Sequence, residues 1–98
     1  MRAHRYALEL PLRYRSIGDR TWSTGTTANI SRSGVLFKGE RSLNIDTEIE
    51  VGLLLSKMTS GADIIFRARV VRMIANGDAT PMLAAAFSNY RFDRARAS

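Results

Sequence analysis

Hydrophobic and polar residues alternate along most of this chain. Between residues 7 and 15 the apolar side chains occupy every second position, as Leu8, Leu10, Leu12 and Tyr14. Alternation of this kind predicts a β-strand with one buried face. Pro11 interrupts the polar face and has no N–H to donate, so we expect this strand to lie at a sheet edge or beside an irregularity.

Similar patterns predict five more strands, at residues 21–30, 35–37, 47–55, 63–74 and 82–87. Gly25 in the second strand indicates a bulge or bend. Turn-forming residues separate the strands at 16–19, at 31–34 and at Asn76-Gly77-Asp78, which is a strong hairpin signal. Six short strands and almost no helical period predict an all-β fold, either a small antiparallel β-barrel or a closed sandwich.

The length of 98 residues fits one small domain. We expect residues 1–6 to form a flexible basic arm and residues 7–88 to form the barrel. Residues 89–98 are expected to form a tail, either one short helix beginning at Asn89 or a frayed end.

Composition excludes several classes of chemistry. The chain has no cysteine and one histidine, His4, so we expect no disulfide, no thiolate or histidine metal site, and no cysteine nucleophile. A chain of 98 residues has a small core, which leaves little room for a deep cleft. We therefore predict a protein that is not an enzyme and needs no cofactor. Charged residues among the first ten and the lack of an apolar run of about 20 residues argue against a signal peptide and membrane insertion, so we expect a cytoplasmic protein.

The formal net charge is +6, and thirteen of the fifteen basic residues are arginine. Arginine binds phosphates and guanine edges through two parallel hydrogen bonds and stacks on bases, so the charge indicates an anionic or nucleotide partner. The alternative is a basic surface that only keeps the protein in solution. We expect Arg67, Arg69 and Arg72 to form an outer face that is either solvated or a surface for a partner. Glu48 and Glu50 should also lie outside, and Trp22 should serve packing.

One segment carries the candidate chemistry. Asn29 and Ser31 lie two residues apart as a predicted strand ends, so they should project from one face and offer an amide and a hydroxyl to one ligand. Gly34 would then permit a positive φ or close approach of a ligand to the backbone. The competing interpretation is a turn that only connects two strands.

Asn29-x-Ser31-x-x-Gly34, followed by Val35-Leu36-Phe37, resembles the motif of PilZ domains. The later Arg69-Val70-Val71-Arg72, the Asn76-Gly77 turn and the strand ending at Phe87 are similar to the last hairpin of that family. The resemblance implies a six-stranded β-barrel that binds the bacterial second messenger cyclic di-GMP. It also implies binding by an N-terminal Arg-x-x-x-Arg arm together with Asn29, Ser31 and Gly34.

The arm departs from the family pattern. With Arg5 as the second arginine, Met1 stands at the position of the first, and Arg2 lies where many members carry an additional arginine. Three interpretations stay open: a reduced set, Arg2 and Arg5, binds the ligand; the full arm lies upstream; or binding has been lost.

We therefore predict a cyclic di-GMP receptor that signals to a protein partner not identified by the sequence. The alternatives are a PilZ scaffold that acts through protein contacts alone and a small barrel that binds single-stranded nucleic acid. The last is disfavoured, because the aromatic residues are scattered singly among the strands instead of being interleaved with basic residues on one face.

Overall fold

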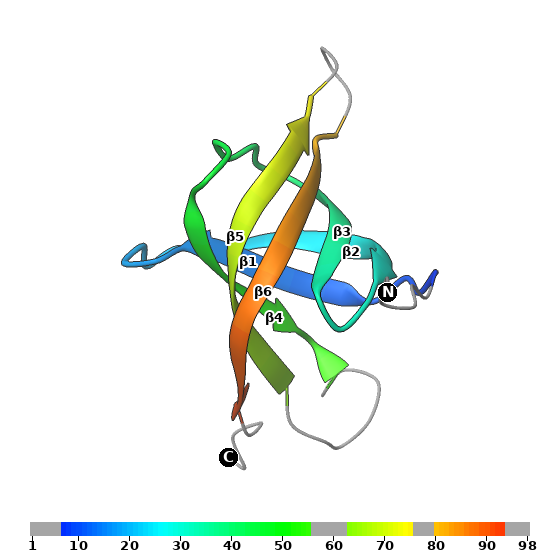
Figure 1. Ribbon diagram of the computed structural model, residues 1–98, viewed down its shortest axis with the longest axis vertical. Helices are drawn as coiled ribbons and strands as arrows, with labels where there is room; N and C mark the ends of the chain where they lie inside the picture. The colour runs from blue at the N-terminus through cyan, green and yellow to red at the C-terminus, as the bar shows by residue number, and fades with distance from the viewer. Residues whose placement is uncertain (1–6, 56–62, 76–79, 94–98) are drawn as a thin grey trace.

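Each strand in the described part of the chain pairs with an antiparallel neighbour on both sides, so the sheet closes on itself. The computed structural model describes residues 7–55, 63–75 and 80–93. Its strands are β1 (Pro11–Ser16), β2 (Ser23–Ile30), β3 (Gly34–Gly39), β4 (Glu48–Leu53), β5 (Asp63–Ile74) and β6 (Met82–Asp93). They form a closed barrel in the order β1-β2-β3-β6-β5-β4 (Figure 1). The predicted all-β, six-stranded antiparallel barrel is confirmed.

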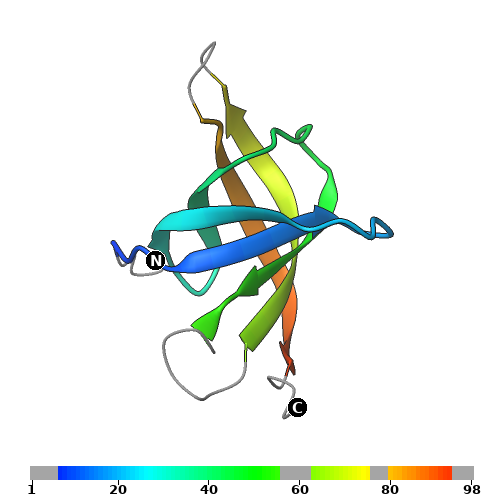
Figure 2. The same ribbon diagram turned by 180° about the vertical axis from the view of Figure 1, so that it is seen from behind.

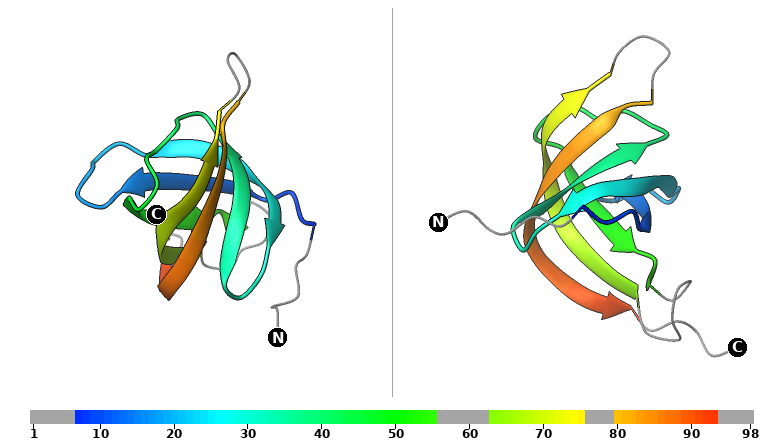
Figure 3. Two further views of the ribbon diagram at one scale, coloured as in Figure 1. Left: turned by 45° about the horizontal axis from the view of Figure 1, so that its top comes forward. Right: turned by 90° about the vertical axis from the view of Figure 1, so that its right-hand side faces the viewer.

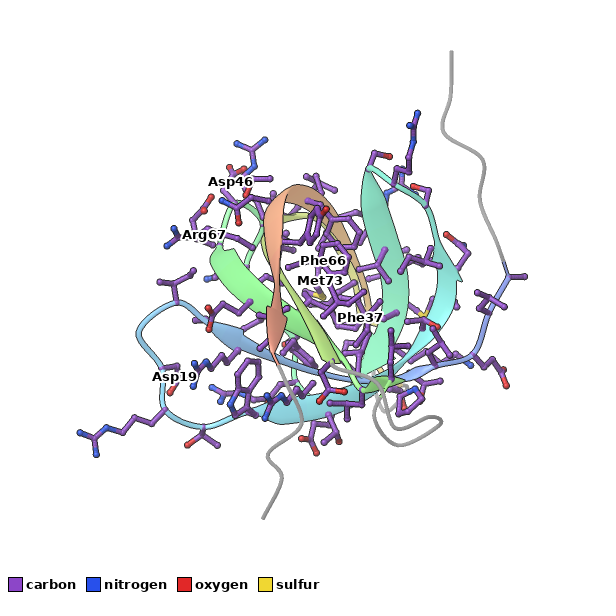
Figure 4. The ribbon with its side chains drawn as sticks, turned by 90° about the horizontal axis from the view of Figure 1, so that it is seen from below. Asp19, Phe37, Asp46, Phe66, Arg67 and Met73 are labelled. Carbon is purple, nitrogen blue, oxygen red and sulfur yellow. The ribbon has the colours of Figure 1, made fainter. Side chains whose placement is uncertain are left out.

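The core fills the inside of the barrel with the inward-facing residues of all six strands. Leu12 and Tyr14 on β1 are buried, as the alternation predicted, and the β4 residues Ile49 and Val51 are fully enclosed. Figure 4 shows Phe37, Phe66 and Met73 inside the barrel, whereas Asp19, Asp46 and Arg67 lie on its outside. The remaining buried apolar residues of this core are Val35, Leu53, Ala68, Val70, Leu83 and Ala85.

Strand β1 begins at Pro11, four residues later than predicted. It lies between β2 and β4, so the expectation of an edge strand was wrong (Figure 2). The predicted irregularity is present, because the chain before Pro11 leaves the regular ladder. Pro11 itself pairs with Thr26, and its carbonyl accepts a hydrogen bond from Leu54 N–H at 3.0 Å. Leu8, expected on the buried face, is 47% exposed.

The bulge in β2 is not at Gly25. Gly25 stays in register with Leu12 on one side and Gly39 on the other, and the register shifts between Thr27 and Asn29 instead. This change of register lies immediately before Asn29, the first residue of the candidate site. The bulge therefore affects which way the side chains at the end of β2 point.

Strands β5 and β6 form one long ribbon, in which β5 continues beyond its pairing with β4 at one end and β6 continues beyond its pairing with β3 at the other (Figure 3). Their pairing runs from Ile74↔Met82 to Asp63↔Asp93, so β6 is six residues longer than predicted. A short helix starting at Asn89 is wrong for residues 89–93, because β5 supplies a hydrogen-bonding partner along this whole segment. Residues 94–98 and the Asn76-Gly77-Asp78 turn lie outside the described residues.

The Tyr14 hydroxyl anchors the loop after β3. It accepts a hydrogen bond from Arg41 N–H at 2.7 Å and donates one to the Arg41 carbonyl. Burial raises the pKa of Tyr14 above its usual value of 10.0, and the bond with the Arg41 backbone opposes this shift only in part. The neutral phenol is therefore favoured by the folded state.

The raised pKa of Tyr14 predicts a loss of stability in alkali. The unfolded chain releases the Tyr14 proton first, so the stabilisation is complete below about pH 10 and is lost as the pH rises toward the folded-state pKa. Above about pH 10, the unfolding free energy of the wild type should fall relative to that of Tyr14→Phe, by at most ~1.4 kcal/mol per pH unit. Urea denaturation of both proteins at about pH 8 and 11 measures this. Tyr6 and Tyr90 are common to both proteins, and a pH-independent difference would contradict the prediction.

Candidate functional site

The turn between β2 and β3 is tightly bonded within itself. Ser31 N–H donates to the Gly34 carbonyl at 2.9 Å, and the Ser31 hydroxyl accepts a hydrogen bond from Ser33 N–H at 3.2 Å. The hydroxyls of Ser31 and Ser33 are 3.1 Å apart. Ser31 is only 8% exposed. Its side chain is thus part of the structure of the turn, as the connecting-turn interpretation expected.

Asn29 lies on the outer side of the barrel. It pairs with Leu36, whereas the next residue, Ile30, pairs with buried Val35 and packs against the core. Alternation along the strand therefore turns the Asn29 side chain away from the core, and it is half-buried there. The outer wall next to the turn thus presents an amide at the point where β2 ends.

Gly34 has a steric role that the sequence suggested only in part. Positive φ angles among the described residues occur at Gly18 and Asp46, so Gly34 does not need one. Instead, a Cβ at Gly34 would lie 2.4 Å from the carbonyl oxygen of Ala85. The close approach at this glycine is therefore that of β6, and the turn is pressed against this strand. Phe87 N–H adds a bond to the Ser33 carbonyl at 2.9 Å.

The start of the described chain is hydrogen-bonded to Thr27, in the second half of β2. Thr27 N–H donates to the Leu10 carbonyl at 2.9 Å, and Leu10 N–H donates to the Thr27 hydroxyl at 2.8 Å. The same hydroxyl donates to the Leu8 carbonyl. Thr27 is two residues before Asn29, so the chain that follows the predicted arm runs next to the end of β2. Arg2 and Arg5 lie outside the described residues.

A second group of polar side chains lies on the outer wall, where the sequence had indicated only packing for Trp22. The guanidinium carbons of Arg13 and Arg15 are 4.2 and 4.0 Å from the centroid of the Trp22 ring. Arg15 also forms an ion pair with Glu50 at 3.0 Å. The signal for this group was present, since the alternation in β1 put both arginines on the face opposite Leu12 and Tyr14.

The outer wall also carries the predicted charges of β4 and β5. Glu50 pairs in register with Arg15 on one side and Arg67 on the other, and Glu48 pairs with Arg69. This confirms the expectation that these carboxylates and the arginines of β5 lie outside, with Arg67, Arg69 and Arg72 exposed. Opposite charges on adjacent strands stabilise such a wall modestly.

Comparison with known proteins identifies the family of this chain. The family model of the PilZ domain matches residues 1–96, which is nearly the whole chain. The chain belongs to the PilZ domain family. PilZ domains generally act as cyclic di-GMP-binding modules and not as enzymes. A search of curated proteins found no match. Among the described residues, no helix is long and apolar enough to cross a membrane.

The contact at Gly34 predicts that even one added methyl group destabilises this PilZ domain. Gly34→Ala forces a Cβ against the Ala85 backbone, and we expect a loss of about 1–3 kcal/mol in unfolding free energy. Gly52→Ala is the matched control, because its Cβ would meet the Arg13 side chain at 3.3 Å, and that side chain can move. Urea denaturation measures both variants. Equal losses would show that the approach of β3 to β6 is not the limiting contact.

Proposed function

We propose that this PilZ domain is a receptor for cyclic di-GMP, bound between the N-terminal Arg2 and Arg5 and the turn from Asn29 to Gly34. The observation that carries the proposal is the bonding of Leu8 and Leu10 to Thr27. These bonds hold residues 8–10, which follow the N-terminal arginines in the sequence, against the half of β2 that leads into the turn. Both parts of the family motif can then reach one ligand.

The residue chemistry fits a cyclic dinucleotide. A guanidinium can pair with a phosphate or with O6 and N7 of guanine, and it can stack on the purine. The Asn29 amide accepts a hydrogen bond from guanine N–H through its carbonyl, without the full charge that an aspartate would offer. Ser31 and Gly34 act mainly by holding the turn in shape against β6, so that Asn29 and the turn backbone face the ligand.

Ligand binding would act on a protein partner through the N-terminal residues. Bringing Arg2 and Arg5 against the turn changes the surface presented at this end of the barrel. Ordering a chain segment costs part of the binding free energy, but it makes the new surface depend on the second messenger. In this proposal the barrel is the rigid part of the receptor and the N-terminal segment is its switch.

A second function has an observation in its favour. Met1 stands where the family pattern has an arginine, and the Ser31 hydroxyl is already held within the turn. Both features would also suit a PilZ scaffold that acts through protein contacts and no longer binds nucleotide. A binding measurement separates the two functions.

The proposal predicts discrimination between cyclic dinucleotides. In calorimetry, cyclic di-GMP should bind and cyclic di-AMP should not, because adenine carries a donor amine in place of the guanine O6 acceptor that an arginine recognises. Equal affinity for both ligands would contradict guanine recognition. Binding of neither ligand by a folded protein would favour the scaffold.

The departure at Met1 predicts a gain of function. With a new start residue placed before it, Met1→Arg restores Arg-x-x-x-Arg with Arg5. One good bidentate contact contributes about 1–3 kcal/mol, so the affinity for cyclic di-GMP should rise by roughly 5- to 150-fold. Arg5→Ala should lower it by a similar factor. The gain should shrink at high salt, because contacts with phosphate are charge-assisted.

Calorimetry at low and high salt measures these effects. The matched control is a chain that carries the new start residue in front of the original Met1. An unchanged affinity in a folded Met1→Arg variant would mean that Met1 does not occupy the position of the missing arginine.

A further inference from the structure

The three arginines of β5 differ in what lies opposite them on β4. Glu50 pairs in register with Arg67, and Glu48 pairs with Arg69. The pairing of β5 with β4 ends there, so in the described sheet β4 supplies no carboxylate opposite Arg72. Arg72 is also exposed. Its guanidinium therefore differs from those of the other two arginines, because no acidic residue of the neighbouring strand offsets its charge.

Arg72 lies in the same cross-strand row as Asn29. Leu36 of β3 pairs with Asn29 on one side and with Ala84 of β6 on the other, and Figure 1 shows β3, β6 and β5 side by side. Ala84 pairs in turn with Arg72. Residues paired across strands lie on the same face of a sheet. The sequence neighbours of Leu36 and Ala84 are buried in the core, so this row faces outward.

The row has the length and the lining of a site for a flat ring. Neighbouring strands are ~4.8 Å apart, so about 14 Å of wall separates the backbone at Asn29 from the backbone at Arg72. Two side chains, two hydrogen bonds of about 2.9 Å and one purine between them bridge this span. Leu36 and Ala84 are half-buried and provide an apolar floor between the two polar ends. In the adjacent row, Gly34 has no side chain that would block the ring.

Guanine carries complementary groups on opposite edges. Its N1–H and its N2 amine donate hydrogen bonds, which suits the side-chain carbonyl of Asn29. O6 and N7 accept hydrogen bonds, which suits two parallel N–H groups of an arginine, and they lie on the edge opposite the N2 amine. A guanine that lies over Leu36 and Ala84 with its donor edge at Asn29 therefore turns its acceptor edge toward Arg72.

The geometry points to Arg72 as a further ligand-binding residue, whose guanidinium donates two hydrogen bonds to O6 and N7 of a guanine held on the outer wall between β2 and β5. This inference rests on the proposed function and adds a specificity-determining residue to it. It extends the site from the Asn29–Gly34 turn across β3 and β6 to the part of β5 that lies beyond β4.

Calorimetry with cyclic di-GMP on the full chain tests this role with a matched pair of variants. Arg72→Gln should lower the affinity roughly 5- to 150-fold, the range for one bidentate contact. Arg67→Gln removes the same charge from the same strand and should change the affinity by less than about twofold. Arg67 is about 16 Å from Arg72 along β5, which exceeds the Debye length of about 8 Å at physiological salt. Both arginines are exposed, so both variants should keep the wild-type melting temperature.

A modified ligand identifies the atoms that Arg72 contacts. Cyclic di-GMP made with 7-deazaguanine has a C–H in place of N7 and keeps O6 and both phosphates. The loss of affinity between cyclic di-GMP and this analogue should be roughly 3- to 10-fold smaller in Arg72→Gln than in the wild type. The variant has already lost the partner of N7, and this part is about half of the free energy of the bidentate contact.

The outcomes separate this inference from the proposed function. A folded wild-type chain that does not bind cyclic di-GMP overturns the proposed function and this inference with it. Wild-type binding with equal affinities in Arg72→Gln and Arg67→Gln overturns the role of Arg72 alone. An equal loss with the 7-deaza analogue in the wild type and in Arg72→Gln would show that Arg72 does not contact N7, which overturns guanine recognition by this residue.

Discussion

The close approach of β3 to β6 at Gly34 is the contact on which both the barrel and its candidate site depend. β3 joins the β1–β2 pair to β6, so the sheet closes only if β3 reaches β6 along its length. At Gly34 the backbones are so close that a Cβ would meet the Ala85 carbonyl. The bond from Phe87 N–H to Ser33 continues this contact into the turn. Closure of the barrel thus also fixes the turn in place.

The position of the aromatic rings in the barrel bears on the kind of ligand that it can bind. Tyr14 and Phe37 are buried inside, where their ring centroids are 5.0 Å apart, and the stacked pair of Phe66 and Phe87 also packs against the core. Trp22 is outside but is already covered by two guanidinium groups. A barrel that binds single-stranded nucleic acid uses aromatic rings on an open face. These rings are engaged elsewhere, which disfavours binding of single-stranded nucleic acid on an open face.

The family motif has a structural and a chemical component in this chain. Ser31 and Gly34 are explained by the turn and by its contact with β6, without any ligand. Asn29, on the outer wall, and the N-terminal arginines are the residues whose chemistry a nucleotide would need. With this division, a PilZ domain could keep the second half of its motif for stability even where the first half varies.

The alternation of apolar and polar residues was enough to predict six strands, their order along the chain and the inward positions of Leu12, Tyr14, Ile49 and Val51. Such predictions succeed because one face of each strand is buried in the core and the other faces solvent. The alternation of apolar and polar residues in a short segment reflects these two faces. The motif likewise located the turn. The bulge after Thr27, the continuation of β6 to Asp93 and the start of β1 at Pro11 were decided only by the tertiary structure. Each depends on pairing with another strand: β3 for the bulge after Thr27, β5 for the end of β6, and β2 and β4 for Pro11. The steric role of Gly34 also required the position of β6, because a glycine in a sequence does not reveal which backbone lies against it.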